Sequence, residues 1–253
     1  GTNWLSKSLL HKVLWRHAAQ IVEPYTTKFY GVLPARVDWL VDMYKLPKSK
    51  CELLVMGADD DKVKEATVPE VRKQIRDKYG IYEDDFLIMT GGKIDPAKVQ
   101  TLQLMEAVTK IDNPKVKLIV FGSVTKDLQE RVNKHCVEDK VLYIGWVRSD
   151  DSYKYFAAAD LVVFPGRHSV FWEQVAGLGI PMLCKYWEGT SHVDLGGNVR
   201  FLYKDSVDEI HSQIKKIVNN RHIYDEMKSV AENQGMKIFS YREIAKRSVG
   251  GGK

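Results

Sequence analysis

The sequence is poor in cysteine. It holds three, Cys51, Cys136 and Cys184, which are widely spaced and include no Cys-x-x-Cys pair. An odd number of isolated cysteines argues against a disulfide framework and against a structural zinc site. This cysteine usage is typical of a reducing compartment, so we expect a cytoplasmic protein.

Long apolar runs and a strong charge excess are also missing. No segment approaches the ~20 apolar residues that cross a bilayer, and no signal-peptide pattern is visible. Lys and Arg number 38 against 33 Asp and Glu, a net charge of +5. Nucleic-acid binders concentrate positive charge more heavily, so the weak excess fits an anionic small ligand or a membrane surface better.

With 253 residues and 44% hydrophobic content, the chain can bury a large core. Apolar residues at helical spacing predict an amphipathic helix in residues 6–25, whose basic face is compatible with docking at an inner membrane face. A second helix is expected over 33–44, followed by a linker at 46–50.

The remainder alternates between strand-like and helical patterns. Nearly continuous apolar runs predict strands at 52–56, 86–90, 116–121, 141–144, 161–164, 181–185 and 199–203. Helices are expected between them at 97–111, 126–136, 151–158, 172–178 and 207–219. This alternation predicts an α/β fold with a doubly wound, Rossmann-like parallel sheet. Ligands of such sheets bind beyond the carboxyl ends of the strands, so the loops there are the candidate site.

One such loop is "TGGKIDPAK", which contains Gly91, Gly92, Lys93 and Lys98. Glycines let a backbone approach an anion closely, and two ammonium groups attract it. The alternative is that this segment is only a tight turn with two lysines on the surface. Gly122 ends the next strand and is also explained by a turn.

Two further loops offer a flat surface and polar groups. Gly145 precedes Trp146, Val147 and Arg148, which could frame a ring or simply pack. In the other loop, His168, Ser169, Val170 and Phe171 lead into the helix expected near Trp172, whose free N–H groups favour phosphate or sugar hydroxyls.

Glu173 follows in the first turn of that helix, where a carboxylate is favoured electrostatically in any case. Its functional interpretation is acceptance of two hydrogen bonds from a ribose diol. Glu188, Thr190, His192 and Asp194 crowd a later loop. His192 and Asp194 lack a third metal ligand at suitable spacing, so we expect no metal there. Together the loops suggest recognition of phosphate, ring and hydroxyl groups, as in a nucleotide-sugar site.

The order of these motifs resembles that of the retaining GT-B glycosyltransferases of family 4, in their C-terminal, donor-binding half. "GGKIDPAK" is similar to the family's diphosphate-binding segment, with Lys93 in place of its Arg and Lys98 as its Lys. "VLYIGWVRSDDSYKYFAAADLVVFP" is similar to its glycine-aromatic turn and following helix, and "FSYREIAKRSV" to its closing helix.

The sequence departs from the family pattern at its two glutamates. The position of the first falls on Pro165 or Gly166, so that acid is absent, and His168 takes its place in our hypothesis. The second is Glu173 or Gln174, of which we favour Glu173 because a charged acceptor holds a diol better.

The resemblance implies a retaining transfer of a hexosyl unit from a nucleotide diphosphate sugar to a glycan or lipid-linked acceptor, as in polysaccharide biosynthesis. It implies no metal and no cofactor, with the nucleotide sugar as the donor substrate. Lys93, Lys98 and His168 would act in catalysis. The alternatives are a non-catalytic nucleotide-sugar-binding module and a sugar-nucleotide epimerase of related fold.

Family members are longer than this chain, which we therefore interpret as a fragment. Residues 1–47 would be the tail of the N-terminal domain and a linker, and 48–235 the donor-binding domain. Residues 236–253 would form a helix that crosses back to the N-terminal domain, through which the acceptor would bind.

Overall fold

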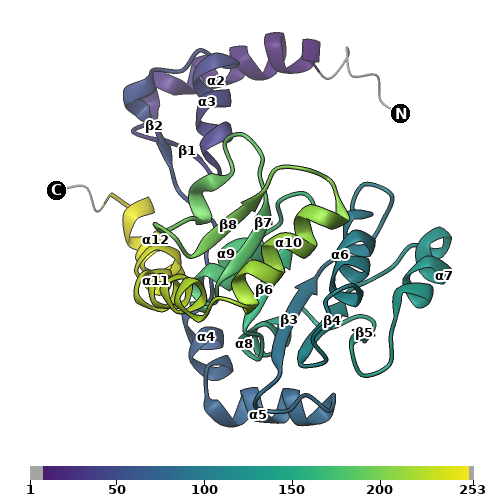
Figure 1. The fold of residues 1–253 in the computed structure, drawn as a ribbon. Helices are drawn as coiled ribbons and strands as arrows, with labels where there is room; N and C mark the ends of the chain where they lie inside the picture. Colours follow the sequence, from purple (N-terminus) through teal and green to yellow (C-terminus); the bar gives the residue numbers. More distant parts are fainter. Residues whose placement is uncertain (1–7, 251–253) are drawn as a thin grey trace. The chain divides into compact units, whose positions relative to one another are not determined.

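The computed structural model describes residues 8–250 of the chain (Figure 1). Its contacts divide these residues into two compact units. The large unit comprises residues 57–186 and 193–245, and the small unit comprises 8–56, 187–192 and 246–250.

The large unit is built on a parallel sheet of six strands in the order β5-β4-β3-β6-β7-β8. The strands are β3 (Phe86–Gly91), β4 (Val116–Phe121), β5 (Val141–Tyr143), β6 (Leu161–Phe164), β7 (Met182–Lys185) and β8 (Val199–Leu202). They lie where the apolar runs predict them, and the doubly wound order is confirmed, because the chain runs outward from β3 to one edge and then from β6 to the other.

Burial on both faces explains the apolar composition of these strands. All four residues of β6 and of β7 are buried. Helices α6 (Gln100–Thr109) and α10 (Val207–Val218) join the core on one face with residues such as Ile214. Helices α8 (Ser152–Ala157) and α9 (Phe171–Gly177) cover the other, where Phe156 packs on Phe121 and Trp172 on Phe164.

The sequence of α10 shows why a helix forms there. Ile210, Ile214 and Ile217 are buried and recur at spacings of four and three, which places them on one face. The Ser206 hydroxyl accepts a hydrogen bond from the Glu209 N–H and caps the first turn. Helix α7 (Lys126–His135) lies where the spacing predicts it.

Three helices of the large unit were not expected in this form. Helices α4 (Asp60–Ala66) and α5 (Pro69–Lys78) precede β3, and α11 (Arg221–Phe239) follows α10. The helix expected from residue 236 is therefore two elements, the end of α11 and then α12 (Tyr241–Ser248). Residues 251–253 of that prediction lie outside the described residues.

The small unit corrects one strand prediction. The run at 52–56 was expected in the large sheet, but β2 (Cys51–Leu53) pairs instead with β1 (Phe29–Gly31) in a sheet of two parallel strands. The helical elements here are η1 (His11–Trp15), α2 (Arg16–Val22), η2 (Glu23–Tyr25), α3 (Pro34–Asp42) and η3 (Lys48–Lys50). Among the described residues, no helix has the length and apolar character that a membrane crossing requires.

Candidate functional site

Two adjoining cavities lie in the large unit, at the carboxyl ends of β3, β4 and β6. The larger, of about 280 Å³, is lined by Gly92, Lys93, Lys98, Phe121, Gly122, Ser123, Trp146, Val147, Ser149, Ser169, Val170 and Phe171. The smaller, of about 30 Å³, is lined by Thr90, Gly91, Gly92, Lys93, Ile94, Lys98, Thr101, Val120, Phe121, Phe164, Pro165, Gly166, Arg167 and Ser169. The lining residues shared by both cavities are Gly92, Lys93, Lys98, Phe121 and Ser169.

Backbone hydrogen bonds hold the loops after β3 and β4 together. The Gly92 N–H donates to the Phe121 carbonyl at 3.0 Å, and the Ile94 N–H donates to that of Ser123 at 2.8 Å. The Gly122 N–H in turn donates to the Gly145 carbonyl at 2.8 Å. These bonds fix the floor of the two cavities, so the groups that line them are held on a rigid frame.

The two lysines of the site lie at the junction of the cavities. The Lys93 side chain is 60% exposed, and its ammonium nitrogen lies 3.4 Å from Asp95 Oδ2, a solvent-screened ion pair of small energy. Asp95 Oδ1 accepts the Ala97 N–H at 3.0 Å and shapes the turn. No described residue forms a hydrogen bond or an ion pair with the Lys98 ammonium. The junction therefore suits an anion.

An exposed aromatic ring borders the larger cavity. The Trp146 side chain is 68% exposed, which is unusual for so large an apolar group and leaves its ring face available for stacking. Phe171 also lines this cavity and is held by packing, because its ring lies 5.2 Å from that of Phe156 and 6.2 Å from that of Phe121.

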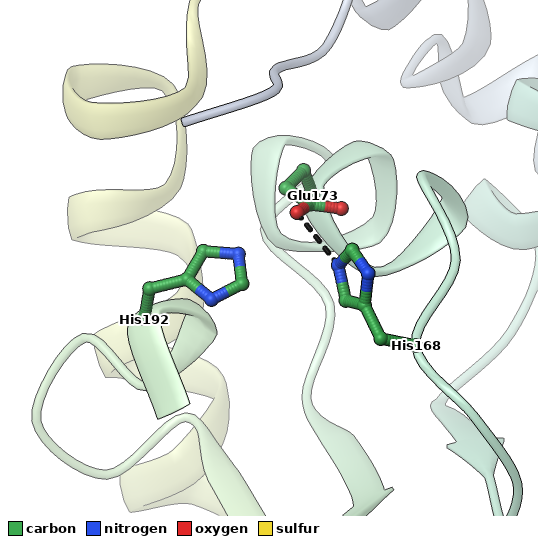
Figure 2. Close-up of side chains that lie close together, drawn as sticks. All are labelled: His168, Glu173 and His192. Atoms are coloured by element: carbon green, nitrogen blue, oxygen red, sulfur yellow. Dashed lines mark hydrogen bonds and ion pairs between the residues drawn. The ribbon is translucent and has the colours of Figure 1, made fainter. Parts of the chain in front are cut away.

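His168 and Glu173 form a hydrogen-bonded pair (Figure 2). His168 Nε2 lies 2.8 Å from Glu173 Oε1, and the Glu173 side chain is fully buried. The His168 ring also meets Trp172 edge-on at 5.1 Å. Burial raises the pKa of the neighbouring Cys184 thiol well above its usual value, and the Glu173 charge adds to this shift. Neither member of the pair lines either cavity.

The structure brings most of the predicted site residues together. Around the cavities lie Gly91, Gly92, Lys93, Lys98, Gly122, Trp146, Val147, Ser169, Val170 and Phe171. Those that line neither cavity are Gly145, Arg148, His168, Glu173 and Gln174. Contact of Glu173 with a ribose stays a prediction, which this placement does not support.

Sequence reasoning missed one charged group of the site, Arg167. It lines the smaller cavity beside Gly166, two residues before Ser169. Arg167 stands in the loop that the sequence analysis selected as a candidate site. The functional roles in that segment were assigned to His168 and Glu173 instead. Three further residues with hydroxyl groups line the cavities and were not among the predicted site residues, namely Thr90, Thr101 and Ser149.

Comparison with solved structures agrees with this fold. The chain is similar to Anabaena HepE in complex with UDP, with a TM-score of 0.73 and 18% identity, covering 92% of this chain and 65% of that one. Against the same protein in complex with UDP-glucose, the TM-score is 0.68 at 18% identity, covering 98% and 70%.

A curated relative is also similar in sequence. Mannosylfructose-phosphate synthase of Agrobacterium fabrum is 22% identical over 233 residues, which are 85% of this chain and 50% of the relative. The chain thus spans half the length of this relative. Residues 71–234 match the family model described as "Glycosyl transferases group 1", a span that contains both cavities and every strand of the large sheet. The chain belongs to the group 1 glycosyl transferases.

Proposed function

We propose that the large unit is the donor site of a retaining glycosyltransferase. The enzyme would transfer a hexosyl unit from a nucleotide diphosphate sugar to a glycan or lipid-linked acceptor. The observation that carries this proposal is the placement of Lys93 and Lys98 at the junction of two cavities beyond the strand ends. The complexes of HepE with UDP and UDP-glucose support the same donor class.

Each end of the donor would meet a different part of the site. The base would stack at Trp146 and Val147, in the larger cavity. The diphosphate would lie at the lysines, where the backbone of Gly92, with a φ of +126°, leaves room for close approach. Negative charge grows on the departing diphosphate in the transition state, and two fixed ammonium groups stabilise it there. Because these groups supply the positive charge, we expect donor binding to be independent of magnesium.

His168, Glu173 and Gln174 receive no donor contact in this proposal, because they line neither cavity. The acceptor would bind in the part of the whole enzyme that lies beyond this donor unit. The basic helical segment near residue 12 would support docking at a membrane surface, a proposal that vesicle binding can test separately.

Calorimetric titration of the full chain with UDP, GDP and ADP, each with magnesium or with a chelator, tests the donor site. We expect micromolar binding of one nucleotide, unchanged by the chelator and at least tenfold weaker in Lys98→Ala. Lys126→Ala is the matched control, because Lys126 is exposed, opens α7 and lines neither cavity. Equal losses in both variants, or no binding of any nucleotide, would refute the donor site.

Product analysis separates the transferase from its alternatives. NMR of the matching nucleotide sugar, incubated with the protein, should show slow release of a hexose whose anomeric configuration matches the donor. An altered sugar still joined to the nucleotide would identify an epimerase. Binding without any turnover by the whole protein would identify a binding module.

A further inference from the structure

A third cation lies close to the two lysines. Arg167 follows Pro165 and Gly166 in the loop after β6, and its exposed side chain lines the smaller cavity together with Lys93 and Lys98. No described residue forms a hydrogen bond or an ion pair with its guanidinium group. All five of its N–H donors are therefore open to a ligand.

The order of residues along the site places Arg167 at one end. Trp146 and Val147 line only the larger cavity, Lys93 and Lys98 line both, and Arg167 lines only the smaller. A nucleotide sugar is a linear molecule in which the diphosphate separates the nucleoside from the sugar. With the base at Trp146 and the diphosphate at the lysines, Arg167 lies on the side of the sugar.

The charge of the site is one-sided at this end. No aspartate or glutamate is present among the described residues that line either cavity. Hydroxyl groups of a neutral sugar donate hydrogen bonds, and carboxylate side chains are their strongest acceptors. The Asp95 carboxylate lies beside the site and pairs with Lys93, which leaves Lys98 and Arg167 without an acidic partner among the described residues. Such a lining fits a ligand that carries its own negative charge.

The smaller cavity is narrow. The centres of water-sized molecules have about 30 Å³ of space in it, which is more than the roughly 10–15 Å³ that one water requires. A small group such as a carboxylate can therefore enter it beside Arg167. The guanidinium fork of arginine matches a carboxylate with two parallel hydrogen bonds, a geometry that lysine lacks.

We propose that the transferred sugar is a hexuronic acid, whose carboxylate is bound by Arg167 in the smaller cavity. This inference rests on the proposed donor site and names the class of sugar that the site prefers.

The test compares neutral and acidic sugars on the nucleotide that binds. The matched pairs are UDP-glucose with UDP-glucuronic acid and GDP-mannose with GDP-mannuronic acid, titrated calorimetrically into the full chain. We expect the acidic sugar to bind at least tenfold more tightly, in line with a charge-assisted pair. Arg167→Gln should reduce that ratio to about one and leave the affinity for the free nucleotide diphosphate within twofold. Arg167→Lys should restore only part of the preference.

Arg131→Gln is the control, since Arg131 is an exposed arginine on α7 that lines neither cavity. An equal affinity of the wild-type chain for both sugars would overturn the inference and leave the donor site intact. A loss of free nucleotide binding in Arg167→Gln would also overturn it, because Arg167 would then hold the diphosphate. If no nucleotide binds at all, both proposals fail.

Discussion

Gly122 lies against Gly92 so closely that a Cβ atom on Gly122 would be 1.8 Å from the Gly92 carbonyl oxygen. Gly122 also has a φ of +134°, a backbone conformation that residues other than glycine rarely adopt. Gly122→Ala should therefore lower the free energy of unfolding by about 2–4 kcal/mol, through overpacking and backbone strain together. Urea denaturation measures this loss.

Gly145→Ala is the matched control for that experiment. Gly145 has a φ of +76°, but nothing lies within 4 Å of the position that a Cβ atom would take there, so only backbone strain of about 1 kcal/mol is expected. If Gly122→Ala and Gly145→Ala lose equal free energy of unfolding, the close contact between Gly122 and Gly92 is not the reason that position 122 requires glycine.

Asp160 neutralises a buried arginine at the opposite end of the sheet. Its carboxylate lies 2.6 Å from Arg72 and 3.3 Å from Arg76, whose side chain is only 2% exposed, and it accepts the Leu87 N–H at 2.7 Å. Asp160→Asn would leave the Arg76 charge without its carboxylate, at a cost of about 3–5 kcal/mol in urea denaturation. The exposed Asp84→Asn, which breaks only the surface pair with Lys115, should show no measurable loss.

Glu173 can be tested for a structural role against a ligand role. Glu173→Ala should lower the free energy of unfolding by about 2–4 kcal/mol, since it removes a buried side chain and its hydrogen bond to His168. Glu173→Gln keeps the shape and should lose less. Nucleotide affinity, measured by calorimetry on the folded variants, should stay within twofold of the wild type. If Glu173→Gln folds normally and no longer binds nucleotide, the result would support the hypothesis that Glu173 contacts the ribose.

Stability at high pH should depend on Tyr224. Burial, and then the negative charge of Asp160, raise the pKa of the Tyr224 hydroxyl above its ordinary value of 10.0. A raised pKa in the folded state gives stability that is complete below pH 10 and is lost as the pH rises beyond it, because the unfolded chain ionises first. The loss approaches about 1.4 kcal/mol per pH unit for one such group.

Urea denaturation of the wild type and Tyr224→Phe at pH 8, 10 and 11 checks this effect. The variant should resemble the wild type at pH 8 and lose less stability at pH 11. Part of the alkaline loss should remain, since burial also raises the pKa of Tyr153. Parallel curves for the two proteins would contradict the assignment.

The strands of the large sheet could be predicted because burial on both faces leaves only apolar residues in them. Local sequence does not reveal which strand another strand pairs with. For this reason the run at 52–56 was assigned to the large sheet, although β2 pairs with β1. Helix α5 could not be recognised by an apolar stripe, because its one fully buried residue is Arg76.

Some features of the candidate site could likewise be predicted from the sequence, and others could not. Glycines and lysines that follow a strand are visible in the sequence, and the structure brings Gly92, Lys93 and Lys98 together. The burial of Glu173 depends on the face of α9 on which it lies, beside the buried Trp172. That face is set by packing against the sheet, which a carboxylate in the first helical turn does not reveal.

The pairing at the centre of the sheet has a consequence for turnover of the protein itself. β3 meets β6 through two residue pairs, Ile88↔Leu161 and Met89↔Val162, whereas β3 meets β4 through six. This is the shortest register in the sheet, and the cavities lie beyond the carboxyl ends of both strands. A nucleotide held there would contact loops that follow strands on both sides of this pairing, and its binding energy would stabilise the folded unit. We expect the lifetime of the chain under limited proteolysis to lengthen with the concentration of the nucleotide that it binds, so that the bound ligand would also protect the protein from degradation.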